Sequence, residues 1–577
     1  MNRPTTPTRT REPVAIVGMA CRFPGAPGVD ALWDLLRTGG DATNETPPDR
    51  YDIEALYAPE PTRGKVISRR SGYLPDVAGF DADFFGLTAE EATHLDPQQR
   101  LLMMLAWEAL EDSGIPPQQI EGTRTGVYVG SVHLHYAELN ARRGLSALRP
   151  SSVHNVYSSL LSGRLSYTFD LRGPSISVDT ACSSSLVAIH LACQSLRSGE
   201  TTLALAAGVN LKFLPDEDVM LSQMPIIAPD GRCKFGDERA DGFAPSDGAG
   251  VVVLKPLSAA LADGDRIRAL ILGSAISNDG RSVPNQLAPS VEGQVQMLRW
   301  AYEDAGVPPA EVDFIEAHGT GTPAIDPVEF AAFGEVLGKD RSADRPCYVG
   351  SVKSNIGHAE GAAGIAALIK TVLCLEHRQI VPSLHYETPN PKIPWQDLPL
   401  RVPTEPLPIP DRGRPLIAGI SGQGISAANT HLVISQADHP TPCEPPPAGG
   451  PHLFVTSART DSALRDTAIA YLAYLTPEGS GSAHRLADIC RSAALNRHHH
   501  VKRLAILAGT HQELSDRLQA FLDGELHPPR ADDTTLQALA HDYLAGEPVK
   551  WASAFPQDTR YVPLPTYPWQ TKRYWLD

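Results

Sequence analysis

The segment 173–186 (GPSISVDTACSSSL) constrains the fold most, because it passes directly from one type of secondary structure into another. Residues 175–178 alternate small and β-branched side chains, which predicts a buried strand. From residue 183 to residue 198, apolar side chains recur at steps of three and four, which predicts a helix that ends at a glycine. Cys182 therefore lies where a strand turns into a helix.

A thiol in this place faces the free N–H groups and the positive end of the helix dipole, which favour the thiolate. The small neighbours Ala181 and Ser183 leave room for a substrate carbonyl group. The alternative is a buried structural cysteine, which is the commoner role of a single cysteine. The tight strand–cysteine–helix turn favours a nucleophile.

Composition limits the kind of protein. A chain of 577 residues is too long for one core, so we expect two or more domains. A net charge of −17 argues against nucleic acid or an anionic membrane as partner. The eight cysteines form no CxxC pair, which predicts reduced thiols in the cytoplasm and neither disulfides nor a metal site. We find no signal peptide and no apolar run that could span a bilayer.

The second half of the chain repeats the first weakly but in order. Four pairs of segments correspond, namely 14–20 with 269–275, 109–117 with 301–309, 126–132 with 313–317, and 177–196 with 351–375. Single matches of this kind arise by chance, whereas four in one order favour duplicated βα halves. In this alignment His358 falls near the place of Cys182, so we expect the two turns to meet.

Changes in composition divide the chain into five parts. They are a flexible N-terminus (1–11), a main domain (12–435), a Pro-rich linker (436–450), a small α/β domain (451–525) and a helix with an aromatic, Pro-rich tail (526–577). The Tyr and Trp residues of the tail favour burial, so we expect it to fold back over the body. Within the main domain, residues 96–114 predict a long amphipathic helix.

Two histidines end predicted strands at glycine-flanked turns, in the segments EAHGTGTP (316–323) and SNIGH (354–358). A lone histidine is more often a core residue than a catalyst. Because His318, His358 and a candidate thiol each end a predicted strand, a Cys/His/His cluster is favoured. The glycines of the first segment allow a ligand to approach the backbone, and Thr320 and Thr322 offer it hydroxyl groups.

These segments carry a resemblance to a known family. EPVAIVGMACRFPG, DTACSSSLVAIHLACQSLRSGE, EAHGTGT and KSNIGH resemble the β-ketoacyl synthase (ketosynthase) domain of modular type I polyketide synthases, over about residues 12–435. Residues 451–525 resemble the linker domain that follows such ketosynthases, and LPTYPWQTKRYW resembles their C-terminal strap. The resemblance implies a thiolase-like fold, in which two duplicated βα halves form a five-layered α/β/α/β/α sandwich.

The resemblance also implies the reaction. Cys182 would accept an acyl group from an acyl carrier protein. His318 and His358 would promote decarboxylation of a malonyl thioester and stabilise the enolate. The result is a decarboxylative Claisen condensation that lengthens the chain by two carbons. Alternatives are a ketosynthase that only transfers the acyl group and an inactive scaffold protein.

Supporting roles follow from the same resemblance. The N–H groups of the cysteine and of Ile425 would form the oxyanion hole. Thr320 and Thr322 would hold the phosphopantetheine arm of the carrier protein, so no bound cofactor is expected. Lys353 and Glu360 would form an ion pair near His358.

The chain departs from the family pattern at two loops. Ile325 stands where the family usually has Gly, and Gln423 stands where Phe is common. Loop 421–430, which includes Asn429, would line the acyl entrance. An amide at Gln423 would favour a polar acyl group, such as a hydroxylated one, unless it turns to solvent.

The resemblance finally implies partners. The family forms homodimers through this domain. No acyltransferase lies between the linker domain and the tail, so a separate acyltransferase would load the malonyl carrier protein in trans.

Overall fold

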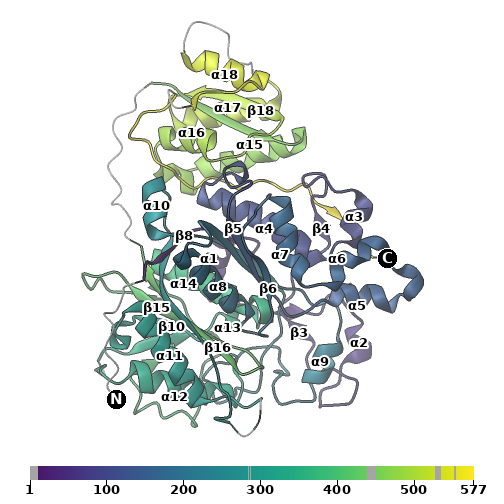
Figure 1. Cartoon of the computed structure of the whole chain (residues 1–577), viewed down its shortest axis with the longest axis vertical. Helices are drawn as coiled ribbons and strands as arrows, with labels where there is room; N and C mark the ends of the chain where they lie inside the picture. The colour runs from purple at the N-terminus through teal and green to yellow at the C-terminus, as the bar shows by residue number, and fades with distance from the viewer. Residues whose placement is uncertain are drawn as a thin grey trace.

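The computed structural model describes residues 11–283, 285, 287–342, 344–437, 450–526, 535–551 and 554–576. Residues 1–10 of the expected N-terminal segment and 438–449 of the expected linker lie outside this description. The main feature is an eleven-stranded sheet with helices on both faces, and a smaller unit lies at one end of the molecule (Figure 1).

The sheet consists of two halves with the same strand order. The first half runs β1 (Val14–Arg22), β8 (Gly248–Pro256), β7 (Leu203–Asn210), β5 (Thr125–Gly130) and β6 (Ser175–Val178). The second runs β9 (Ala269–Asn278), β16 (Ala428–Gln436), β15 (Ile417–Gln423), β10 (Phe314–Glu316) and β11 (Cys347–Gly350), with β13 (Leu400–Arg401) at its edge. The halves join where β1 and β9 pair antiparallel. The five corresponding strands of each half make two antiparallel and two parallel pairings in the same order, and β13 adds one more parallel pairing to the second half. The predicted duplication is therefore confirmed.

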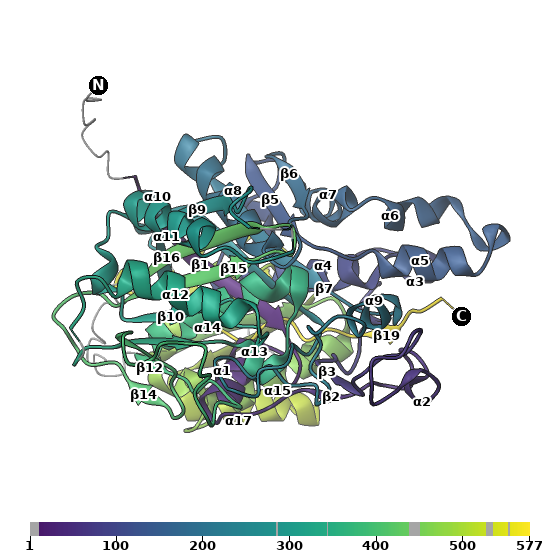
Figure 2. The ribbon, with the colours of Figure 1, turned by 90° about the horizontal axis from the view of Figure 1, so that it is seen from below.

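Helices complete five layers. Two helices fill the space between the halves, α8 (Ser184–Ser198) and α14 (Ala363–Glu376). The first half is covered outside by α4 (Pro97–Ser113) and α7 (Ser159–Thr168), and the second by α11 (Val291–Ala305) and α12 (Ile325–Leu337). Figure 2 shows α11 and α12 on the second half and α7 beside β5 and β6. The expected thiolase-like fold is therefore confirmed.

Close packing of the central helices explains their composition. At Gly364 of α14, an added Cβ would lie 2.5 Å from Leu186 of α8, so only glycine allows this approach. Ser185 of α8 accepts a hydrogen bond from the backbone of Ile365 at 3.1 Å. The small residues of both helices therefore permit a buried, tightly packed central layer.

Helix α4 differs from the expected amphipathic helix, because it is buried on nearly all sides. Its ends are as predicted: Asp96 caps the first turn and Gly114 closes the helix with a φ of 70°. Its polar side faces the C-terminal tail, where Glu108 accepts a hydrogen bond from Trp569 and Arg100 donates one to the backbone of residue 574. The covering segment lies far away in the sequence, so local periodicity could not reveal it.

The smaller unit consists of one antiparallel strand pair and flanking helices. They are β17 (His452–Ala458), β18 (Lys502–Ala508), α15 (Asp461–Leu475), α16 (Leu486–Leu495), α17 (His511–Asp523) and α18 (Thr535–Ala545). The tail then runs back along the main body, and its strand β19 (Lys572–Arg573) pairs with β4 (Gly79–Phe80). Figure 1 shows this tail as a yellow trace that ends beside α3 (Ala89–His94).

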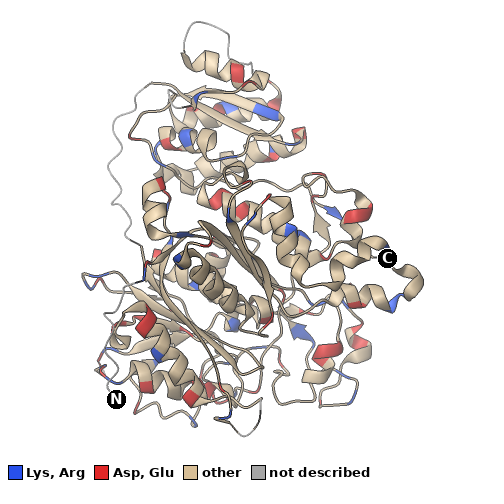
Figure 3. Ribbon diagram, in the orientation of Figure 1, with Lys and Arg blue, Asp and Glu red and all other residues tan. Residues whose placement is uncertain are grey.

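Two further observations concern the surface. Among the described residues, no helix combines the length and hydrophobicity needed to cross a bilayer. Lys and Arg positions are scattered over the view of Figure 3 and do not gather on one element, in keeping with the net charge of −17.

Candidate active site

The Cys182 turn is short and is held by side chains next to it, one of which, the carboxyl group of Asp179, accepts the N–H of Ala181 at 2.8 Å. Residues 179–183 make the whole connection between β6 and α8. The hydroxyl of Ser184 accepts a hydrogen bond from the N–H of Thr180 at 2.9 Å and donates one to the carbonyl of Ala181 at 2.5 Å. Ala181 has a φ of 55°, in the left-handed region that costs free energy for a residue other than glycine.

Cys182 is partly buried and lines a cavity. Burial, and after it the negative charge of Glu360, raises the pKa of the thiol to about 12. The predicted resting thiolate is therefore wrong, because desolvation outweighs the attraction of the helix N-terminus. The helix dipole can still stabilise negative charge while it develops on sulfur.

The two histidines lie together on the same cavity. The ring centroids of His318 and His358 are 5.4 Å apart, and the rings are nearly perpendicular at 85°. The N–H of Gln423 donates to Nδ1 of His318 at 3.3 Å, and the N–H of Glu360 donates to Nδ1 of His358 at 3.2 Å. A nitrogen that accepts carries no proton, so each neutral ring has its proton on Nε2.

Burial keeps both rings neutral. Burial, and then the nearby charge of Lys353, lowers the pKa of His318 well below its ordinary value and that of His358 to about 3. Burial also lowers the pKa of Lys353, against the pull of Glu316 and Glu329. The cavity therefore contains two uncharged N–H donors beside one thiol.

Two buried acidic side chains accept hydrogen bonds from the backbone of the loop after His318. Asp326 accepts the N–H of Gly321 at 3.1 Å, and Glu329 accepts the N–H groups of residues 318 and 319 at 2.7 and 2.9 Å. On the same loop, the hydroxyls of Thr320 and Thr322 lie 3.1 Å apart in the cavity wall. This arrangement presents two hydroxyl groups on a fixed backbone.

The predicted ion pair between Lys353 and Glu360 is wrong. Glu360 instead contacts Lys212 at 3.1 Å and His133 at 2.5 Å, and no ion pair joins it to Lys353 within the described residues. Lys353 is buried on the short helix α13 (Lys353–Ile356). The carboxylate therefore connects the His358 turn to the ends of β5 and β7.

Loop 421–430 places its predicted residues on the cavity. Ile425 is half-exposed at the rim, with a relative exposure of 50%, whereas Gln423 is 7% exposed. The buried Nε2 of Gln423 has no hydrogen-bond partner, so the alternative of a solvent-facing amide is wrong. Asn429 donates to Asp279 at 2.6 Å, and both line the cavity.

The rest of the wall is mainly apolar. It includes Val132, Leu221, Met224, Ile226, Phe243 and Ile325. Ile325, which stands where the family usually has glycine, therefore adds a branched apolar side chain to the cavity.

Sequence reasoning missed three residues beside the site, His133, Lys212 and Glu217. His133 and Lys212 follow closely after β5 and β7, so the rule that found His318 could have indicated them. Ligand atoms of His133, Glu217 and Glu360 lie within 4.8 Å of one another, a spacing that suits a metal ion. The ammonium group of Lys212 already contacts both carboxylates, so this cluster contains a cation of its own.

Comparison with known proteins identifies the family. Three family models match, the N-terminal domain of β-ketoacyl synthases over residues 11–260, their C-terminal domain over 268–387, and the ketoacyl-synthetase C-terminal extension over 389–507. One component protein of the phenolphthiocerol/phthiocerol polyketide synthase of Mycobacterium tuberculosis is 44% identical over 520 residues, which is 90% of this chain and 28% of that protein. The chain thus spans about a quarter of the curated relative.

Solved structures agree with these matches over nearly the full chain. An oxazolomycin ketosynthase domain of Streptomyces albus is 36% identical with a TM-score of 0.89, and the match covers 98% of each chain. The ketosynthase from module 6 of the bacillaene synthase of Bacillus subtilis is 32% identical with a TM-score of 0.87, covering 98% of this chain and all of that one. The chain therefore belongs to the β-ketoacyl synthases, and among them to the ketosynthases of polyketide synthases.

Proposed function

We propose that this chain condenses a carrier-bound acyl group with a malonyl unit and so lengthens it by two carbons. One observation carries the proposal: a thiol and two neutral imidazoles, each with its proton on Nε2, line one cavity. Thiols form acyl intermediates, and uncharged donors stabilise the oxygen of an enolate.

In the first step, Sγ of Cys182 attacks the carbonyl carbon of the incoming thioester. The bond from that carbon to the carrier sulfur breaks, and the proton of Cys182 ends on the departing thiolate. The backbone N–H groups of Cys182 and Ile425 stabilise the oxyanion. Ile425 is suited to this role because its loop forms the rim of the cavity beside the cysteine.

In the second step, Nε2–H of His318 and of His358 donate to the thioester oxygen of the malonyl group. The carboxylate leaves as carbon dioxide, and its electron pair forms the enolate. The enolate carbon attacks the acyl carbonyl and the bond to Sγ of Cys182 breaks. Because burial raises the pKa of this thiol to about 12, the departing thiolate then takes up a proton from solvent water.

Both acyl units would arrive on the phosphopantetheine arm of an acyl carrier protein, and the enzyme itself would hold no cofactor. Thr320 and Thr322 can hydrogen-bond this arm because their hydroxyls face the cavity. Too few residues lie between α17, which ends at Asp523, and the tail for an acyltransferase. We therefore propose that an acyltransferase outside residues 12–577 loads the malonyl carrier protein.

A homodimer would cover the edge of the sheet at β6. This strand was expected to be buried, but it lies at the sheet edge, and Ile176 is 41% exposed. Exposed apolar side chains continue from it, with Tyr167 at 82% and Val156 at 55%. Unpaired edges and apolar patches favour association. Light scattering at micromolar concentration should give a dimer, and a monomer would contradict this assignment.

We place the enzyme in the cytoplasm. Within the described residues all seven cysteines are free, and thioester chemistry needs the nucleophile in its reduced form.

Gln423 is the residue that we expect to select the acyl group. Its buried amide nitrogen has no partner and borders the cavity, so a substrate oxygen can satisfy it. An acyl group with a hydroxyl or carbonyl near the thioester provides that acceptor, whereas a saturated chain does not.

Intact-protein mass spectrometry with a panel of acyl thioesters tests the proposal. The wild type should gain one acyl mass, and Cys182→Ala should gain none while still folding. Cys193→Ala is the matched control and should load normally, because Cys193 is a buried cysteine on α8, the helix after Cys182, and does not line the cavity. Loading of Cys182→Ala at the wild-type rate would show that another residue is the nucleophile. Loading without malonyl consumption would indicate a transfer-only enzyme, and no loading of the wild type would indicate a scaffold.

A further inference from the structure

Glu360 has a backbone conformation that is unusual for its residue type. Its φ is 42°, in the left-handed region, and the residue is 4% exposed. In this conformation its N–H points at Nδ1 of His358 and donates to it at 3.2 Å. A non-glycine residue keeps such a conformation only when its surroundings hold it there.

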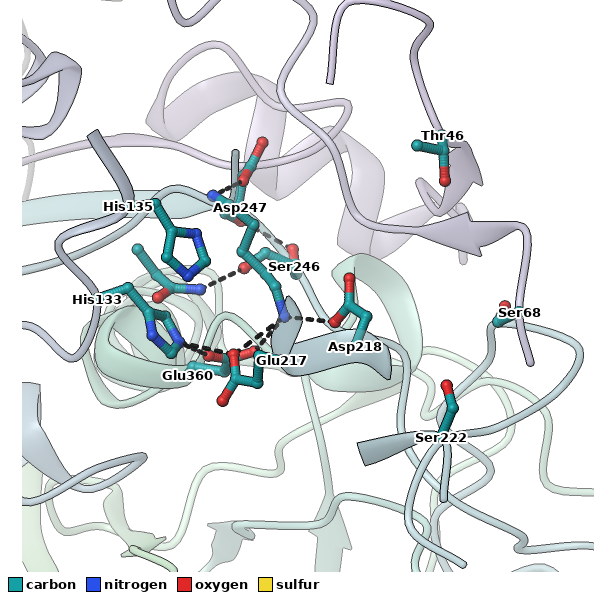
Figure 4. A network of polar contacts seen from close by, with 12 residues as sticks. Thr46, Ser68, His133, His135, Glu217, Asp218, Ser222, Ser246, Asp247 and Glu360 are labelled. Atoms are coloured by element: carbon teal, nitrogen blue, oxygen red, sulfur yellow. Dashed lines mark hydrogen bonds and ion pairs between the residues drawn. The ribbon is translucent and has the colours of Figure 1, made fainter. Parts of the chain in front are cut away.

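Two cationic side chains hold the carboxylate of Glu360, and Figure 4 shows one of them, His133, beside it. Nζ of Lys212 contacts Oε1 at 3.1 Å, and Nε2 of His133 contacts Oε2 at 2.5 Å. Both oxygens are therefore bound, each by a different strand end, so the side chain is fixed in two directions.

The charges of this cluster support one another. Burial disfavours the ammonium group of Lys212, but Asp218 and Glu360 outweigh burial and raise its pKa. Burial also lowers the pKa of His133, while Glu360 and Glu217 raise it to about 10. Burial alone would raise the pKa of Glu360, and Lys212 and His133 together lower it. At neutral pH the cluster therefore consists of ion pairs.

Lys212 is itself held in place. Its N–H donates to Asp247 at 2.8 Å, and its Nζ contacts Asp218 at 2.6 Å. Asp247 in turn pairs with the buried Arg50 at 2.8 Å. The anchor of Glu360 is thus part of a network attached to the core.

We propose that Lys212 and His133 are positioning residues for His358. They hold the carboxylate of Glu360, keep this residue in the left-handed conformation, and so fix the N–H group that selects the Nε2–H tautomer of His358. Neither side chain needs to touch the substrate. The inference rests on the proposed condensation, because the selected tautomer is the one that donates to the enolate oxygen.

A matched pair of variants at position 360 separates this role from a role of the carboxylate itself. Glu360→Gly and Glu360→Ala both remove the charge and differ by one methyl group. Glycine adopts a φ near 42° freely, whereas alanine adopts it only at a cost in free energy. We expect Glu360→Gly to retain at least about fivefold more malonyl decarboxylation than Glu360→Ala, with equal acyl loading of Cys182. Equal rates, or a faster alanine variant, would overturn the proposal.

A second comparison tests Lys212. Lys212→Met should reduce decarboxylation about tenfold in the wild-type background and less than about threefold in the Glu360→Gly background, since glycine needs no anchor. Lys255→Met is the matched control, because Lys255 is a buried lysine paired with Asp263 and Asp265 outside the cavity. It should lower stability without a change in decarboxylation. Equal losses from Lys212→Met in both backgrounds would contradict the inference.

The thermal midpoint gives a readout that is independent of activity. Glu360→Gly should unfold at a higher temperature than Glu360→Ala, even if no malonyl substrate is turned over. A wild-type enzyme without decarboxylation would refute the proposed function alone. If Glu360→Ala unfolded at a higher temperature than Glu360→Gly, the positioning role alone would be refuted. The same comparison tests the positioning role if Lys212→Met does not fold.

Discussion

The two halves of the sheet present their chemistry at equivalent strand ends but hold it differently. After β6 the chain passes through one short turn into α8, and the hydroxyl of Ser184 fixes that turn. After β11, helix α13 and a second turn come before α14, and ion pairs of Lys212 and His133 fix that turn. The order of segments predicted between the halves is confirmed, but the predicted pairing of 177–196 with 351–375 is shifted, because β6 ends at Val178 and its equivalent β11 already ends at Gly350. His358 is therefore reached by a longer connection than Cys182.

This difference follows from what each group must do. In the proposed reaction the thiol forms and breaks a bond to an acyl carbon, so its turn needs small neighbours that leave room. The imidazole must keep one tautomer, so its turn needs a fixed N–H donor. A charge placed directly on the ring would alter its protonation, whereas Glu360 carries the charge on its side chain and offers the ring only its backbone.

The largest effect should come from removing the donors. His318→Ala and His358→Ala should still accept an acyl group on Cys182 but lose about 10² to 10³ in carbon dioxide release, as expected for a positioned donor. His190→Ala is a control, because this histidine lies on α8 and contacts Ser274 outside the cavity. Mass spectrometry and carbon dioxide assays separate the steps, and normal condensation by His358→Ala would contradict the assignment.

The ion pairs that hold the His358 turn should also make the free energy of unfolding depend on pH. His133 faces Glu217, Glu360, Lys212 and the neutral ring of His135, and its pKa of about 10 exceeds the unfolded value of about 6.5. A histidine whose pKa is higher in the folded than in the unfolded state stabilises the fold fully below its unfolded-state pKa. This stabilisation is lost as the pH rises through its folded-state pKa. The free energy of unfolding should therefore fall between about pH 7 and pH 10, by up to about 1.4 kcal/mol per pH unit.

Urea denaturation across this range measures the slope, and His133→Gln should flatten it. The comparison with the variant is needed because other lysine, cysteine and tyrosine side chains also titrate there. An unchanged slope in the variant would show that His133 does not carry the effect.

Local sequence patterns predicted the elements that are continuous in the chain. The Cys182 turn, the duplicated halves and the glycine-flanked histidines all rest on short segments whose strand, turn and helix are adjacent. Patterns failed where a property depends on distant partners. Lys212 and Glu360 are 148 residues apart, so their pairing had no local signal, and the resemblance suggested Lys353 instead.

The pKa of Cys182 and the burial of α4 were hard to predict from the sequence for the same reason. The predicted thiolate of Cys182 rested on its own helix, whereas the pKa depends on a cavity whose walls come from several distant loops. The burial of α4 likewise depends on a tail that returns from the end of the chain.

A smaller effect should come from the amide at Gln423. Gln423→Phe should shift the ratio of loading and condensation rates toward saturated over hydroxylated acyl thioesters, by about tenfold, because an unsatisfied buried amide costs about 1 to 3 kcal/mol. Gln294→Met is the control, since Gln294 also has a buried, unpartnered Nε2 but does not line the cavity. If the ratio of rates with saturated and hydroxylated thioesters did not change in Gln423→Phe, Gln423 would not be the residue that selects the acyl group.

The smallest effect should come from the strained residue of the Cys182 turn. Ala181 keeps a φ of 55° without ion pairs, so Ala181→Gly should raise the free energy of unfolding by about 1 kcal/mol, the relief of strain exceeding the entropy gained by the unfolded chain. Ala188→Gly, in the interior of α8, should lower it by about the same amount, because glycine is unfavourable in a helix. Chemical denaturation of both variants measures the signs. If both substitutions destabilise, Ala181 is not strained, and the parallel between Ala181 and Glu360 in the two turns does not hold.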